Sequence, residues 1–145
     1  MNKHKSEYPK IWIGQNYESG GLFGKKILIV GESTHKRGDK NNPYKFENSN
    51  IDMALDHIGK YDEDGIYKNY SDQFRTKLMR VFLKSQGIYN DLIKEFWHSV
   101  AFFNYYIEPL HDAGEKPEKD TKHQSLAYRL CENKPHLVVV VSYCL

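Results

Sequence analysis

One short apolar run constrains the fold of this 145-residue chain more than any other feature. Ile27-Leu28-Ile29-Val30 contains no polar residue, which is typical of a strand that a parallel sheet buries on both faces. The run stops at Gly31, and four polar residues that can take part in chemistry, Glu32 to His35, follow at once. Ligands of open α/β sheets bind beyond the carboxyl ends of the strands, so we expect a site at this junction.

Two further apolar runs, Ser99–Tyr106 and Leu137–Val141, predict the other strands of the sheet. The segments between them carry apolar residues at helical spacing. The expected helix starts are Ser49 or Asn50, Ser71, Asn90, and Thr121 or Ser125. Strands that alternate with helices predict a single α/β domain over residues 1–145. Its sheet is expected to be mainly parallel, with Ile27–Val30 as the central strand between the other two.

The run Leu137–Val141 is the most hydrophobic of the three and lies close to the last residue, Leu145. Such a run normally sits inside a sheet, with further elements after it. Two interpretations stay open at this point: a sheet complete with three strands, or a sheet that is truncated after the third strand. In both cases we expect an exposed edge beside Leu137–Val141, which favours self-association or pairing with a partner strand.

Composition excludes several classes of protein. The net charge of +2 is well below that of a dedicated DNA-binding domain, and it neither indicates nor excludes nucleic acid. Cys131 and Cys144 lack the spacing of a metal site and predict free thiols in a reducing cytoplasm. Residues 1–10 lack the apolar core of a signal peptide, and no apolar run approaches the ~20 residues that span a membrane. No metal motif or cofactor motif is present in the sequence, so we expect neither group.

The residues after the first strand can support acid–base or nucleophilic chemistry. Gly31 permits a close backbone approach, Glu32 can polarise water or stabilise positive charge, Ser33 can act as nucleophile or donor, and His35 can transfer protons. Asn104 ends the second predicted strand, and its amide offers the donors and the acceptor that read the edge of a base. A parallel sheet would bring Asn104 near Glu32.

Residues 36–50 are polar and predict a long loop over the carboxyl end of the first strand. Tyr44 and Phe46 in this loop are candidates for stacking on a base, a contact worth ~1–3 kcal/mol in single-strand binders. The alternative is that both rings pack on the loop itself. The predicted site is therefore one cleft, lined by Glu32, Ser33 and Asn104 and roofed by this loop.

Four segments, in order along the chain, resemble the uracil-DNA glycosylase-like superfamily, in particular bacterial members with a G-E-S-x-H type first motif. They are Trp12–Tyr17, Gly24–Ser33, Phe96–Tyr105 and Lys134–Val141. The resemblance implies a three-layer α/β/α sandwich around a short parallel sheet. It implies that Gly31, Glu32 and Ser33 position water or stabilise charge, and that Asn104 reads the base.

The same resemblance implies a DNA-repair function, in which a damaged or deaminated base is recognised or excised by hydrolysis of its N-glycosidic bond. The expected partner is DNA, single-stranded or containing uracil. The chain departs from the family pattern in three places: Thr34 replaces a frequent proline, Ser33 replaces the aspartate of the most active branch, and no counterpart of the final His-Pro-Ser-like loop precedes Leu145. Because that loop contacts the base, we expect weak or absent excision.

Two alternative functions stay open. One is a non-enzymatic module of the same fold that binds nucleic acid or a nucleotide. The other is an esterase that resembles GDSL-type hydrolases, with Ser33 as nucleophile, Asn104 as oxyanion donor, and Asp120 and His123 completing the triad. In that family the D-x-x-H block follows the last strand, whereas here a predicted helix and strand follow His123. The G-E-x-x-H pattern also resembles erythromycin-esterase-like proteins, whose domains are much longer.

Overall fold

A mixed sheet lies at the centre of the computed structural model, which describes residues 9–32, 48–59, 73–84, 90–106 and 123–141. Within these residues its strands are β1 (Trp12–Ile13), β2 (Ile27–Gly31), β3 (Val100–Asn104) and β4 (Leu137–Val140), in the order β1-β3-β2-β4. β2 pairs in parallel with β3 and with β4. The prediction that Ile27–Val30 is the central strand, with parallel neighbours on both sides, is confirmed.

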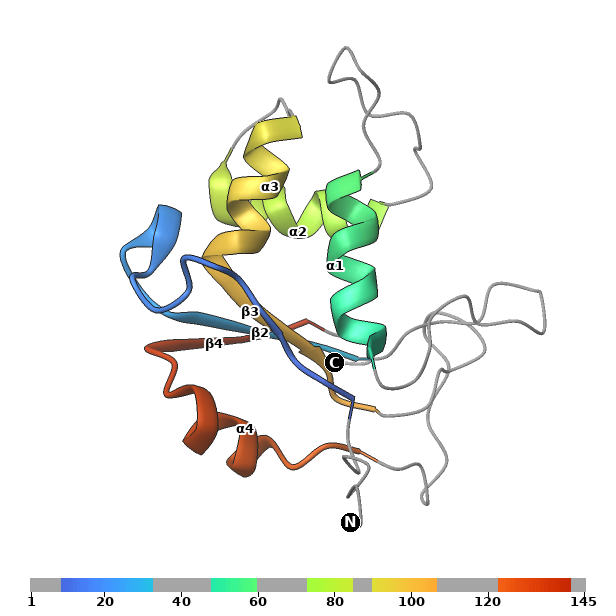
Figure 1. Cartoon of the computed structure of the whole chain (residues 1–145), viewed down its shortest axis with the longest axis vertical. Coiled ribbons are helices and arrows are strands. Elements are labelled where there is room, and N and C mark those ends of the chain that lie inside the picture. Colours follow the sequence, from blue (N-terminus) through green and yellow to red (C-terminus); the bar gives the residue numbers. More distant parts are fainter. Residues whose placement is uncertain (1–8, 33–47, 60–72, 85–89, 107–122, 142–145) are drawn as a thin grey trace, which may run out of the picture.

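Helices lie on both faces of this sheet. Figure 1 shows α1 (Ser49–Gly59), α2 (Gln73–Leu83) and α3 (Asn90–Ser99) on one face and α4 (Leu126–Asn133) on the other. The hydroxyl oxygen of Ser125 accepts a hydrogen bond from the N–H of Tyr128 at 3.2 Å, so Ser125 caps α4. No helix in the described part of the chain is long and apolar enough to cross a membrane.

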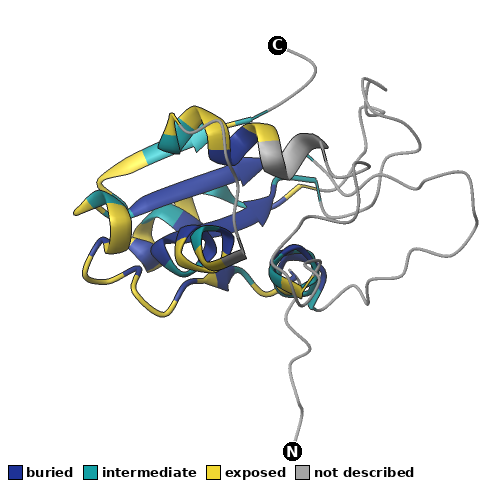
Figure 2. Ribbon diagram, turned by 90° about the horizontal axis from the view of Figure 1, so that it is seen from above, coloured by how far each residue is buried: buried dark blue, intermediate teal, exposed yellow. Residues whose placement is uncertain are grey.

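Alternate residues of the strands supply two separate apolar clusters, as the pleat of a strand requires. Ile27 and Ile29 belong to the cluster under α1, α2 and α3, whereas Leu28 and Val30 belong to the smaller cluster against α4. Both clusters bury β2 and β3 completely, and Figure 2 shows these strands dark blue at the centre. The two central strands are thus buried on both faces, as the strands of a parallel sheet are.

Trp97 of α3 connects three elements on the larger face. Its indole N–H donates to Nδ1 of His57 in α1 at 2.8 Å, and its carbonyl oxygen accepts from the indole N–H of Trp12 in β1 at 2.8 Å. The centroid of the His98 ring lies 5.6 Å from that of the Trp12 ring. Burial lowers the pKa of His98 below 6.5, and the charge of Lys94 acts in the same direction.

The structure adds a strand at one edge of the expected sheet and leaves the other edge as expected. Residues 9–14 include β1, a strand that the sequence did not predict, which pairs antiparallel with β3. At the opposite edge, β4 is the outermost strand of the described sheet, in agreement with the exposed edge expected beside Leu137–Val141. Val138 packs in the α4 cluster and Val139 in the opposite one, so helices on both faces explain an apolar strand at an edge.

Candidate functional site

The carboxyl ends of β2 and β3 bring the predicted site residues to one end of the sheet. Gly31 is the register partner of Asn104. Beyond the strands, the N–H of Tyr105 donates to the Gly31 carbonyl at 2.8 Å, and the N–H of Tyr106 donates to the Glu32 carbonyl at 2.9 Å. The segments that continue β2 and β3 therefore stay hydrogen-bonded up to Glu32. Gly31, Glu32 and Asn104 lie at the same end of the sheet.

Gly31 is required by the approach of the Asn104 side chain. A Cβ atom at residue 31 would clash with Oδ1 of Asn104 and would also press on the ring of Phe102. Asn104 itself is only 6% exposed. The glycine of the first motif therefore makes room for the amide of the second strand, which is the close backbone approach that the sequence indicated.

Asn104 follows Phe102 on the face of α1, α2 and α3, as its contact with Gly31 shows. The carbonyl oxygens of Gly31 and Glu32 both accept from the segment that continues β3, whereas the carbonyl oxygen of Val30 accepts from Val141 beside β4. Consecutive carbonyls of a regular strand point to opposite sides, so Glu32 stands beyond the regular part of β2.

Aromatic residues continue this edge beside Glu32. The ring of Tyr105 stacks on the imidazole of His123, with centroids 4.9 Å apart and planes 7° from parallel. Tyr106 forms an isolated antiparallel bridge with His123, and its ring meets that of Tyr105 edge-on. His123 is the histidine of the esterase interpretation. Tyr106 lies between His123 and Glu32, because it forms the bridge with His123 and donates its N–H to the Glu32 carbonyl.

Several predicted site residues lie outside the described residues. They are Ser33, His35, Tyr44, Phe46 and Asp120. The cleft and its aromatic roof therefore stay predictions, as does the esterase triad.

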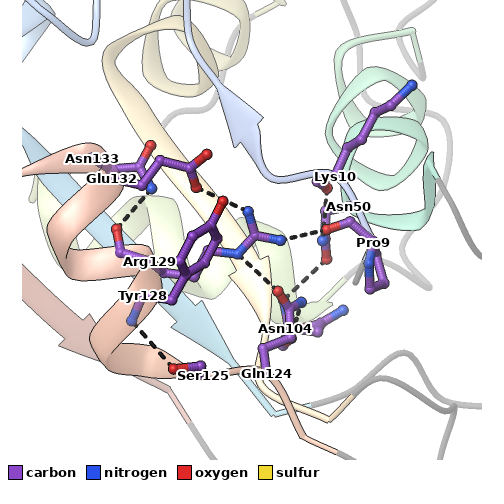
Figure 3. A network of polar contacts seen from close by, with 10 residues as sticks. All are labelled: Pro9, Lys10, Asn50, Asn104, Gln124, Ser125, Tyr128, Arg129, Glu132 and Asn133. Carbon is purple, nitrogen blue, oxygen red and sulfur yellow. Dashed lines mark hydrogen bonds and ion pairs between the residues drawn. The ribbon is translucent and has the colours of Figure 1, made fainter. Parts of the chain in front are cut away.

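The structure adds residues that the sequence did not assign to the site. Asn50 and Gln124 form hydrogen bonds with the main chain of Asn104, and the buried guanidinium of Arg129 bonds to Gln124 (Figure 3). Asn50 was expected only as a helix-capping residue. Arg129 gave no signal, because an arginine in an amphipathic helix is ordinarily at the surface.

Among the described residues, no group of three or more His, Cys, Asp and Glu side chains is arranged to hold a metal ion. Comparison of the chain with protein-family models, curated proteins and solved structures found no match. Function is therefore inferred from the geometry at the carboxyl ends of β2 and β3.

Proposed function

We propose that this domain recognises an unpaired nucleobase of DNA at the carboxyl ends of β2 and β3, in the manner of uracil-DNA glycosylase-like proteins, and that it excises the base weakly or not at all. The observation that supports this most is the register of Gly31 with Asn104, with the Asn104 amide against the glycine. Helices on both sheet faces fit the three-layer sandwich of that superfamily.

The chemistry of an asparagine amide suits uracil. Its oxygen accepts a hydrogen bond from an imide N–H, and its nitrogen donates to a ring carbonyl. Cytosine presents the reverse pattern at the same atoms, a ring nitrogen that accepts and an amino group that donates. In this proposal Asn104 reads the base, while Glu32 stabilises positive charge on the sugar or orients water, together with Ser33 and His35. An unpaired base is favoured, because it needs no extraction from a duplex.

Fluorescence anisotropy with labelled single strands tests recognition. The strands are identical except for one central position, which is uracil in one and cytosine in the other. We expect the native chain to prefer uracil, and Asn104→Asp, which removes the amide donor, to lose about tenfold in this preference. Asn16→Asp at an exposed position is the matched control for the added charge. Equal affinity of the native chain for both strands would overturn the proposal.

A cleavage assay on the uracil strand measures excision. We expect little product, and less still with Asn104→Asp or Glu32→Gln, because one lost electrostatic contact to a transition state typically costs ~10²–10³ in rate. Product that both substitutions leave unchanged would indicate a contaminating enzyme. Ester hydrolysis that Ser33→Ala abolishes would favour the esterase instead.

A further inference from the structure

Buried hydrogen bonds on both sides of Asn104 hold its main chain. The side chain of Asn50 donates to the carbonyl oxygen of Lys10 at 2.9 Å and accepts from the N–H of Asn104 at 3.0 Å. The side-chain nitrogen of Gln124 donates to the carbonyl oxygen of Asn104 at 2.9 Å. Both main-chain polar groups of Asn104, its N–H and its carbonyl oxygen, are thus bonded to side-chain amides.

Arg129 closes these contacts into a ring (Figure 3). Its Nε donates to Oε1 of Gln124 at 2.9 Å, and its Nη2 donates to the carbonyl oxygen of Pro9 at 2.7 Å. Because Pro9 and Lys10 are neighbours in sequence, the five hydrogen bonds return to their starting point. The ring joins the N-terminal segment, α1, the end of β3 and α4.

Four of the five bonds of the ring are buried and the bond from Asn50 to Lys10 is partly buried, so the ring bonds are not exchanged freely with water. Asn50 and Gln124 are each 1% exposed, and Arg129 is 6% exposed. Each amide uses both its oxygen and its nitrogen, and leaving one such buried group unbonded costs ~1–3 kcal/mol. The guanidinium is held further by Glu132 at 3.1 Å and by the ring of Phe103, 5.8 Å away.

The position of the ring explains why side chains perform this task. Tyr105 bonds to Gly31 of β2, so the N–H and carbonyl of Asn104 point to the other side of β3. On that side β1 does not extend as far as Asn104, since its two residues pair with Phe102 and Ala101 of β3. Asn50 and Gln124 supply the bonds that a longer β1 would supply.

We propose that Gln124 and Arg129 are positioning residues, which hold the peptide of Asn104 and thereby aim its amide at the base. This inference rests on the proposed function. Neither residue needs to touch the nucleic acid. Their effect is to restrict the main chain from which the base-reading side chain projects.

Gln124→Glu tests the inference with little change in shape. The carboxylate still accepts from Arg129 but cannot donate to the carbonyl of Asn104. We expect this variant to stay folded and to lose the preference for uracil over cytosine about as fully as Asn104→Asp, about tenfold. Gln15→Glu, the same substitution at an exposed position, should change nothing. An unaltered preference in Gln124→Glu would overturn the inference.

A second readout separates this inference from the proposed function. Backbone ¹⁵N relaxation should show Asn104 rigid in the native chain, with an order parameter of about 0.85, and looser in Gln124→Glu, while β2 stays rigid. Arg129→Lys should also loosen Asn104, because one ammonium group cannot replace both bonds of the guanidinium. This variant takes the place of Gln124→Glu if Gln124→Glu does not fold. A native chain without base preference would contradict the proposed function alone. An equally rigid Asn104 in both variants would contradict the positioning role.

Discussion

The two edges of the sheet are built in opposite ways. β1 has only two residues, yet it is secured by the indole hydrogen bond of Trp12 and by two N–H groups that follow it. Gly14 donates to β3 at 2.9 Å, and Asn16 donates to α3 at 2.8 Å. β4 is longer and consists of apolar residues, yet Leu137 and Val140 are 46% and 55% exposed. Hydrophobicity along the chain therefore does not rank the strands by burial.

Backbone geometry sharpens the contrast. Leu137 and Val141 donate their N–H groups to Lys26 and Val30, so alternation turns the N–H groups of Val138 and Val140 away from β2. No other strand of the described sheet pairs with them. An apolar edge without lysine, proline or a bulge is the kind that pairs with another chain.

The largest expected difference between the edges is in stability. Trp12→Ala should lower the free energy of unfolding by about 3–5 kcal/mol, because it removes a buried indole and leaves the Trp97 carbonyl without its donor. Val140→Ala should change it by about 0.5 kcal/mol or less, since the side chain is largely exposed. Urea denaturation measures both values. Similar losses would show that the edges are equally packed.

A smaller effect is expected in association. Val140→Lys places a charge on the β4 edge and should weaken any self-association, while its free energy of unfolding stays within about 1 kcal/mol of the native value. Sedimentation velocity over a range of concentrations measures this. Val81→Lys on the exposed face of α2 is the matched control. If the control reduces association equally, net charge rather than the edge is responsible.

A single hydrogen bond of Tyr17, in the turn that follows β1, also contributes to the more firmly secured edge. Its hydroxyl donates to the carbonyl of Asn133 at 3.1 Å, and Tyr17→Phe should cost about 1 kcal/mol. Burial, together with Glu18, raises the pKa of Tyr17 to about 12 from 10.0. As the pH rises, the Tyr17 hydroxyl therefore ionises in the unfolded chain before it ionises in the folded chain. The contribution of Tyr17 to stability is complete below pH 10 and is lost as the pH rises to about 12.

Thermal unfolding from neutral to alkaline pH tests this sign. The difference in stability between the native chain and Tyr17→Phe should shrink above pH 10. A difference that grows with pH would mean that the folded state accommodates the ionised ring.

The central part of the fold was predictable because it follows from local patterns. The apolar run Ile27–Val30 and helical spacing from Ser49 onward identified β2 and α1, and strand–helix alternation predicted parallel pairing. The proximity of Gly31 and Asn104 followed, since the carboxyl ends of neighbouring parallel strands meet. β1 could not be predicted, because a two-residue strand has no periodicity and is stabilised by contacts with α3.

The sequence by itself determined most of the segments that form strands and helices and which polar residues stand at their ends, because both depend on the order of neighbouring residues. Only the tertiary structure decided that Trp12–Ile13 forms an edge strand, and that Asn50, Gln124 and Arg129 enclose Asn104. The members of that ring lie far apart in the chain. Their meeting depends on how elements pack, and the burial that makes their hydrogen bonds obligatory exists only after packing.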